Sequence, residues 1–308
     1  MTEPAAHIGQ DAVLATTAGE VLLLRGGSQQ PEVLRVLRGL APGAPIALPD
    51  SFLLATQEGS VYRLGYNEGK VLWVSQLAEN ITGDLAITEK ALFVLSEMRL
   101  LALSPGSGEL LAETRLPAAA TCGPVLWQGR VLVGCERIGL VAYDPETLQP
   151  VLSAPVAAGS VGQLAVLGDT AFVTDSDGAL SLWQVPGEPL ASLVGVPGVT
   201  GQLVPAAGSV LAVCGTRMLA ISAGGQVLWE SSLGRSCNVA VSPEGKRALL
   251  ACPLGRLTLL DTATGRELKQ GLTGSRPFAA GFLGSGQFYV ASIDRRLDLV
   301  SFKGEGSL

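Results

Sequence analysis

A short apolar phrase recurs eight times along this chain, and its spacing limits the possible folds more than any other feature does. The copies begin near residues 12, 52, 92, 131, 171, 211, 248 and 288, so their starts lie 40, 40, 39, 40, 40, 37 and 40 residues apart. Each copy is rich in β-branched, aromatic or other apolar residues and ends on a small or polar residue. A fixed period of this length, with several strands in each period, is typical of repeat proteins.

Each period contains candidate strands separated by turns. A second apolar stretch such as SVYRL (60–64) follows the phrase, and a short stretch of small residues such as QLAV (163–166) precedes it. Turns such as TQEGS join the phrase to the stretch that follows, which is the pattern of a tight hairpin. A further, outer stretch is recognisable in five periods, at residues 70–75, 109–115, 150–154, 226–231 and 266–270.

These patterns predict an all-β protein, an eight-bladed β-propeller of four-stranded antiparallel blades, with residues 1–308 forming one domain. The 3.6-residue periodicity of helical repeats is absent. A seven-bladed ring is the alternative, if the first or the last period is an appendage. Because no outer stretch is visible after the last period, we expect the eighth blade to have three strands or to be completed by residues that precede the first inner strand.

Charge and hydropathy argue against nucleic acid binding and against a membrane span. The net charge is −6 and the pI is about 5.0, which argues against nucleic acid because phosphate binding needs a clustered basic face. The 28 residues from Pro189 to Thr216 carry no charge, but five glycines and three prolines interrupt them, so we predict no membrane span. No signal peptide is visible at the N-terminus, and we expect a cytoplasmic monomer, or a periplasmic protein if the chain is a processed form.

The cysteines and the single histidine give little support for catalysis or metal binding. The five cysteines form no CxxC motif, so a zinc site is not expected. We expect reduced, buried thiols, although Cys122/Cys135 and Cys237/Cys252 each flank a hairpin and would face each other across it. His7 stands alone near the N-terminus, where we predict a partly buried structural role rather than membership of a catalytic triad.

Two outer stretches carry a family resemblance. GKVLW (69–73) and GQVLW (225–229) resemble the PQQ-like propeller repeat, in which a glycine turn leads to a tryptophan that docks on the neighbouring blade. The resemblance assigns that docking role to Trp73 and Trp229. The corresponding positions in three other periods hold Ala112, Leu152 and Lys269.

A second stretch resembles another propeller repeat. Residues 240–268 are similar to the YVTN-type unit, with Asp261, Thr264 and Gly265 in its D-x-x-T-G turn. Both resemblances imply the same fold, and propellers serve many unrelated functions.

The quinoprotein dehydrogenases share the PQQ-like repeat, and the resemblance therefore raises PQQ as a cofactor. In that family the quinone stacks between a tryptophan and a disulfide of adjacent cysteines, near a calcium ion. No two cysteines are adjacent in this sequence, and the carboxylates are scattered. The run Asp175–Gly178 looks like a calcium loop, but it occupies a turn position that Asp and Gly favour for geometric reasons, so we interpret it as a turn. We predict no bound metal and no required cofactor.

Charges in the turns supply the one candidate binding site. In a propeller, the turns between the second and third strands of each blade and the connections between blades lie on one face, here called the loop face. In blades two to five these positions carry acidic residues, Glu58, Glu79, Glu97, Glu136, Asp175 and Asp177. In blades six to eight they carry Arg217, Arg235, Arg256, Arg276, Arg295 and Arg296, although Arg99 and Arg137 interrupt the acidic part.

Two interpretations of these charges stand side by side. Solvated turns are commonly charged without any binding role, whereas a face divided by sign would orient a protein partner. The leading functional hypothesis is a non-enzymatic protein-interaction scaffold, as in the PQQ-like proteins of the BamB type. The alternatives are a protein that binds or senses a quinone such as PQQ in the axial channel and, third, a quinoprotein-type oxidoreductase.

Overall fold

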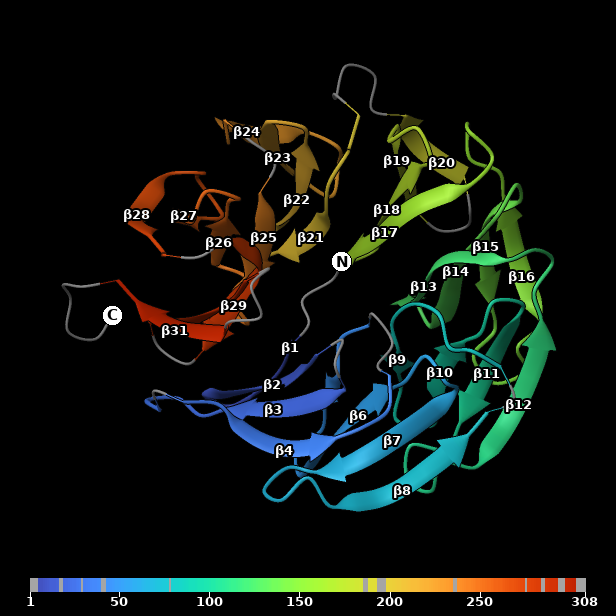
Figure 1. Ribbon diagram of the computed structural model, residues 1–308. Coiled ribbons are helices and arrows are strands. Elements are labelled where there is room, and N and C mark those ends of the chain that lie inside the picture. The colour runs from blue at the N-terminus through green and yellow to red at the C-terminus, as the bar shows by residue number, and fades with distance from the viewer. Residues whose placement is uncertain are drawn as a thin grey trace.

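Thirty-one β strands and no helix are found in the part of the chain that the computed structural model describes. The described residues are 5–16, 19–28, 30–39, 43–77, 79–184, 188–192, 198–234, 237–274, 276–283, 286–292 and 297–302. Each strand pairs antiparallel with its sequence neighbour, which groups the strands into eight separate sheets. Figure 1 shows these sheets, the blades, following one another around a ring in chain order.

Each blade runs outward from its inner strand. The strands of blades 1 to 4 are β1 (Ala5–Ile8), β2 (Asp11–Ala15), β3 (Glu20–Leu24), β4 (Glu32–Val36), β5 (Ile46–Ala47), β6 (Ser51–Ala55), β7 (Ser60–Gly65), β8 (Val71–Gln76), β9 (Ala86–Ile87), β10 (Leu92–Leu95), β11 (Arg99–Leu103), β12 (Leu110–Arg115), β13 (Ala120–Trp127), β14 (Arg130–Cys135), β15 (Gly139–Tyr143) and β16 (Pro150–Ala154). The strands of blades 5 to 8 are β17 (Val161–Leu167), β18 (Thr170–Asp175), β19 (Leu180–Gln184), β20 (Glu188–Ser192), β21 (Leu203–Ala206), β22 (Ser209–Cys214), β23 (Arg217–Ile221), β24 (Val227–Ser232), β25 (Asn238–Val241), β26 (Arg247–Ala251), β27 (Arg256–Asp261), β28 (Glu267–Leu272), β29 (Pro277–Leu283), β30 (Gln287–Ser292) and β31 (Leu297–Ser301).

Burial explains why the recurring phrase is apolar along its whole length. The phrase forms the second strand of each blade, which is covered on both faces by neighbouring blades; β6, β10 and β22 are buried at every position. Outer strands such as β8 instead alternate between half-buried and exposed positions, because only one face packs inward. The sequence pattern therefore changes from continuous to alternating from the inside of a blade to its edge.

Hydrophobic clusters hold the blades together. Eight clusters are found among the described residues, and each joins two neighbouring blades. One of them joins the last blade to the first, with Leu283 and Tyr289 packed with Ala12 and Leu24. A hydrogen bond of 2.8 Å from the Gly27 amide to the Gln287 side chain crosses the same junction. The ring is therefore closed through side-chain packing.

The predicted eight blades are confirmed, and the seven-bladed alternative is wrong. Seven blades have four strands, and the eighth has three within the described residues, β29, β30 and β31. Two outer strands were missing from the sequence prediction, β4 in blade 1 and β20 in blade 5. The repeat pattern does not identify β4, because its EVLRV sequence carries two charges and lacks the glycine–tryptophan signature.

Candidate functional site

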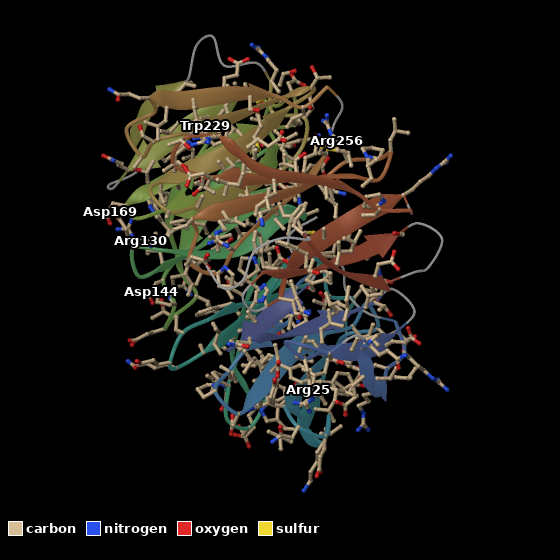
Figure 2. All side chains as sticks on the ribbon, turned by 90° about the vertical axis from the view of Figure 1, so that its left-hand side faces the viewer. Arg25, Arg130, Asp144, Asp169, Trp229 and Arg256 are labelled. Carbon is tan, nitrogen blue, oxygen red and sulfur yellow. A yellow bond between two sulfur atoms is a disulfide. The ribbon has the colours of Figure 1, made fainter. Side chains whose placement is uncertain are left out.

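Strand direction places the turns on two opposite faces. Because successive strands are antiparallel, the second-to-third-strand turns and the blade-to-blade connections share the loop face, while the remaining hairpin turns share the other face. The opposite face is here called the hairpin face. In the edge-on view of Figure 2, Arg130, Asp144 and Asp169 of the hairpin face lie along one side, and Arg256 of the loop face lies away from them.

Four of the predicted acidic residues stand on the loop face with exposed side chains. Glu58, Glu97, Glu136 and Asp177 occupy the second-to-third-strand turns of blades 2, 3, 4 and 5 in that order. Within the described residues, the carboxylates of Glu58, Glu97 and Asp177 form no ion pair, whereas Glu136 lies 3.5 Å from the guanidinium of its neighbour Arg137. The acidic half of the face is thus a row of solvated carboxylates on consecutive blades.

Asp175 has a different role, because it is buried beneath its turn. Its carboxylate accepts hydrogen bonds from the backbone amides of Asp177 (3.0 Å), Ala179 (2.8 Å) and Ala158 (3.1 Å). These bonds fasten the turn to the connection that enters blade 5, and they use the oxygens that a calcium ion would need. The interpretation of Asp175–Gly178 as a turn is supported, and Asp175 does not belong to an exposed surface.

Glu79, in the connection between blades 2 and 3, belongs to a charged network. Its carboxylate lies 2.9 Å from the guanidinium of Arg99 and accepts a 2.6 Å hydrogen bond from the buried Ser96 hydroxyl. Arg99 also reaches Glu113 of β12, at 3.0 Å. Arg99 is therefore paired with two carboxylates, one from the connection before blade 3 and one from its outer strand.

The basic half of the face is less free than the sequence suggested. Arg217 pairs with Glu230 of β24 at 2.7 Å, and Arg256 donates a 2.6 Å hydrogen bond to the carbonyl oxygen of Leu233. Arg276 is exposed and forms no ion pair in the described part of the chain. Arg235, Arg295 and Arg296 lie outside the described residues. Arg217 and Arg256 thus fasten third strands to their surroundings.

The two signature tryptophans contact the next blade. The indole nitrogen of Trp73 donates to the carbonyl oxygen of Pro105 in blade 3 (3.1 Å), and that of Trp229 donates to Thr262 in blade 7 (2.8 Å). A glycine of the same turn lies under each ring: a Cβ atom on Gly108 or Gly265 would approach the ring to 2.5 Å. The geometry fits the docking role that the resemblance implies.

The expectation of five reduced cysteines is wrong. Cys237 and Cys252 form a disulfide, with their Cα atoms 4.3 Å apart, whereas Cys122, Cys135 and Cys214 are free thiols. Since Asn238 pairs with Ala251 in an unbroken ladder, the two bonded cysteines stand directly opposite each other. In blade 4 the ladder shifts register, so Cys122 faces Gly134 and Cys135 faces Ala120. A register shift on either side of Cys122, the second at Gly123–Pro124, keeps the second pair apart.

His7 is partly buried in β1, as predicted. Its Nε2 atom is buried and has no hydrogen-bond partner among the described residues, and burial lowers the pKa of the imidazole. A neutral, structural imidazole is consistent with this environment.

A cavity of about 550 Å³ opens beside the axis at blades 5 to 7. Its lining comes mainly from β21, β25 and the turn that follows β25, with Gln163 from blade 5 at one edge. The side-chain carbonyl of Gln163 accepts from the Leu203 amide, and that of Gln202 accepts from the Val239 amide, both at 2.8 Å. The sequence contains a signal for these residues, since glutamine opens the inner stretch in both blades.

The cavity does not suit PQQ. Among the described residues that line it, the only charged side chain is Glu244 and none is tryptophan, so this set neither neutralises the carboxylates of the quinone nor offers an indole for stacking. The disulfide joins cysteines 15 residues apart rather than adjacent ones. The residues present therefore do not reproduce the clamp of the quinoprotein dehydrogenases.

Two kinds of feature are absent from the described residues. They contain no group of three or more His, Cys, Asp or Glu side chains arranged to hold a metal ion. They also contain no helix long and apolar enough to cross a membrane.

Comparisons with known proteins agree with the fold. Residues 57–236 match the family model described as outer membrane protein assembly factor BamB. The crystal structure of BamB from Moraxella catarrhalis superposes with a TM-score of 0.70 at 16% sequence identity, covering 97% of this chain and 96% of that chain. The computationally designed Ika8 protein superposes with a TM-score of 0.79, also at 16% identity, covering 97% and 95%.

No curated protein matches the chain by sequence. The family model nevertheless spans more than half of the chain, and it includes both signature tryptophans. On this evidence the chain belongs to the PQQ-like β-propeller family of the BamB type.

Proposed function

We propose that this protein is a non-enzymatic scaffold that binds a protein partner through its loop face. The observation that carries the proposal is the row of exposed carboxylates, Glu58, Glu97 and Asp177, on blades 2, 3 and 5 of a rigid ring. Several other charges on this face are paired within the fold, as in the Arg217–Glu230 and Arg99–Glu79 ion pairs, whereas these three carboxylates form no ion pair among the described residues. Loops carried on a fixed frame are the usual place for recognition.

The chemistry of the row favours a partner with a basic surface. Unpaired carboxylates on one face attract cationic groups over about 8–10 Å at physiological salt and raise the association rate. Arg276 adds a positive charge at blade 8, which retains part of the predicted division by sign. The matching family model, outer membrane protein assembly factor BamB, is consistent with a protein that acts by holding other proteins.

The disulfide bears on the compartment. Disulfides persist in oxidising environments and are rare in the cytosol. We therefore propose that Cys237–Cys252 forms in an oxidising compartment such as the periplasm, in place of the cytoplasm that the sequence suggested.

Charge reversal on the loop face tests the proposal. The triple variant Glu58→Lys, Glu97→Lys, Asp177→Lys should bind the partner about tenfold more weakly at low salt, with the difference shrinking as salt rises. The partner would be captured from native host extract, identified by mass spectrometry, purified, and measured against each variant by surface plasmon resonance.

A matched control carries the same change in charge on the opposite face. Glu68, Glu109 and Asp169 are exposed in hairpin-face turns of blades 2, 3 and 5, and the variant Glu68→Lys, Glu109→Lys, Asp169→Lys should bind normally. Equal loss in both triples would mean that net charge, and not the loop face, governs binding, and the proposal would then fail.

A further inference from the structure

The cavity beside the axis lies at the junction of blades 6 and 7 and is framed by hydrogen bonds at both ends. Near the loop face, the Gln202 side chain accepts from the Val239 amide at 2.8 Å. Near the hairpin face, the Ala207 amide donates to the Gly245 carbonyl at 2.9 Å. A Cβ atom on Gly245 would lie 2.6 Å from the Ala207 nitrogen, so this second contact requires glycine. The two inner strands are thus fixed relative to each other above and below the cavity.

The walls between these two contacts are aliphatic. Leu203, Ala206, Val239 and Val241 are buried side chains of the lining, and Val204 is half-buried beside them. A preformed cavity of this size with apolar walls and a few polar groups is typical of small-ligand sites. The apolar body of a ligand would replace water along these walls.

The polar groups at the rim define the charge that the cavity accepts. Among the described residues of the lining, Glu244 in the turn after β25 is the only charged one, and none is Lys, Arg or His. A carboxylate ligand would therefore be repelled at this rim and would find no cation within the cavity, whereas an ammonium group would pair with Glu244.

We propose that this cavity binds small amphipathic amines, with the apolar body between β21 and β25 and the ammonium group beside Glu244. The site is separate from the loop-face carboxylates, so it stands whether or not the loop face binds a protein partner.

Three probes that differ only in the end group test the proposal: 4-phenylbutylamine, 4-phenylbutanol and 4-phenylbutyrate. Binding to the full chain would be followed by methyl NMR titration. We expect saturable shifts of the Val204 and Val239 methyl groups, with the amine bound about three- to tenfold more tightly than the carboxylate, as an exposed ion pair allows. In Glu244→Gln the amine and the carboxylate should bind within about twofold of each other. Asp169→Asn, an exposed carboxylate on the hairpin-face turn of blade 5, should leave the preference unchanged.

A second variant fills the cavity. Ala206→Phe places a ring between the two strands and should abolish saturable binding of all three probes while the circular dichroism spectrum of the β fold is retained. If that variant does not fold, the wild-type methyl shifts decide. Saturation at Val204 and Val239 with one dissociation constant supports the site, and shifts confined to other residues overturn it. Equal or tighter binding of 4-phenylbutyrate, or binding that survives in folded Ala206→Phe, also overturns it.

Discussion

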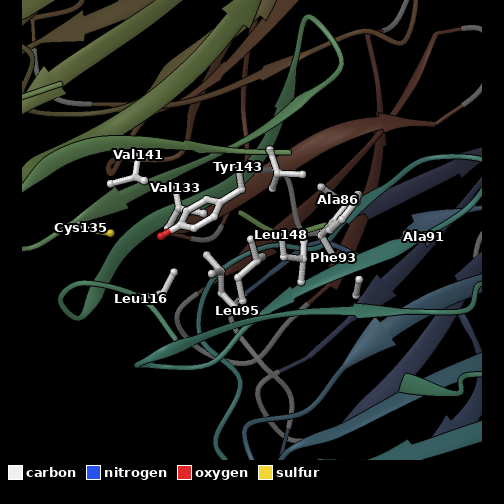
Figure 3. Packing of buried hydrophobic residues seen from close by; sticks show 13 residues of the cluster. Ala86, Ala91, Phe93, Leu95, Leu116, Val133, Cys135, Val141, Tyr143 and Leu148 are labelled. Atoms are coloured by element: carbon white, nitrogen blue, oxygen red, sulfur yellow. The ribbon is translucent and has the colours of Figure 1, made fainter. Parts of the chain in front are cut away.

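The junction of blades 6 and 7 and the junction of blades 3 and 4 solve the same packing problem with opposite choices of residue. At the first, the large Trp229 of the outer strand rests on Gly265, whose φ is +69°. At the second, the small Ala112 stands in the tryptophan position, and Leu148 in the facing turn is fully buried with φ at +52°. Figure 3 shows Leu148 inside the cluster of that junction, near Phe93 and Leu95. Volume removed from one blade is thus supplied by the next.

The same two junctions treat their cysteines differently. Blade 7 holds the Cys237–Cys252 disulfide, while the Cys135 thiol of blade 4 stays free within the cluster that contains Tyr143. Burial raises the pKa of the Cys135 thiol to about 11, which suppresses its thiolate at neutral pH. At these two junctions the signature residues of the repeat differ together with the residues that face them across the junction.

The largest loss of stability is expected when the turn residue of the blade 3–4 junction is placed at the blade 6–7 junction while Trp229 is kept. Gly265→Leu should lower the free energy of unfolding by about 3–5 kcal/mol, because the side chain enters the Trp229 ring and the backbone keeps a left-handed φ. Urea denaturation measures the change. The double variant Gly265→Leu, Trp229→Ala should be destabilised by about 1–2 kcal/mol less than the sum of the two single variants, because neighbouring residues couple.

A mirror-image pair provides the control for that cycle. Ala112→Trp with Leu148→Gly should also be less destabilised than the sum of its single variants. Additive behaviour at both junctions would show that the volume is not exchanged across them.

Removing the disulfide should lower the stability by an intermediate amount. Cys252→Ala opens a loop of 15 residues and should cost about 2–3 kcal/mol of stability under oxidising conditions. The same stability measurement made with reductant should show a much smaller difference from the wild type. Cys135→Ala should respond equally in both conditions, and denatured, unreduced protein should titrate with three thiols. Five thiols would mean that the bond does not form.

The smallest effect is expected at the Tyr143 hydroxyl. It is buried, has no hydrogen-bond partner among the described residues, and has its pKa raised by burial. Leu260 is the corresponding cluster residue at the blade 6–7 junction and has no hydroxyl. Tyr143→Phe should therefore stabilise the protein by about 1 kcal/mol, measured as a higher urea midpoint at an unchanged slope. A loss of stability would reveal a partner for the hydroxyl.

The repeat period and the alternating hydrophobicity were enough to predict the blades. The second strand of each blade must be apolar along its length because it lies between two neighbouring blades. Features set by contacts between strands were not predictable in the same way. The bulges near Cys122 separate that residue from Cys135; Gly123 and Pro124 mark an irregular strand there, but they do not tell which residues face each other across the ladder. The ion pair of Arg217 was not predictable for the same reason, since its partner Glu230 lies on the next strand, diagonally across the ladder. The acidic row was predictable because exposed turns need no such partner.

The glutamine bonds beside the axis bear on how such a ring changes in size. Gln163 in blade 5 caps the Leu203 amide in blade 6, and Gln202 in blade 6 caps the Val239 amide in blade 7. Blade 6 therefore donates an amide hydrogen bond to the glutamine of its predecessor and accepts the equivalent bond from the amide of its successor. A duplicated copy of blade 6 would therefore find an equivalent hydrogen-bond partner at the axis in each of its two neighbours.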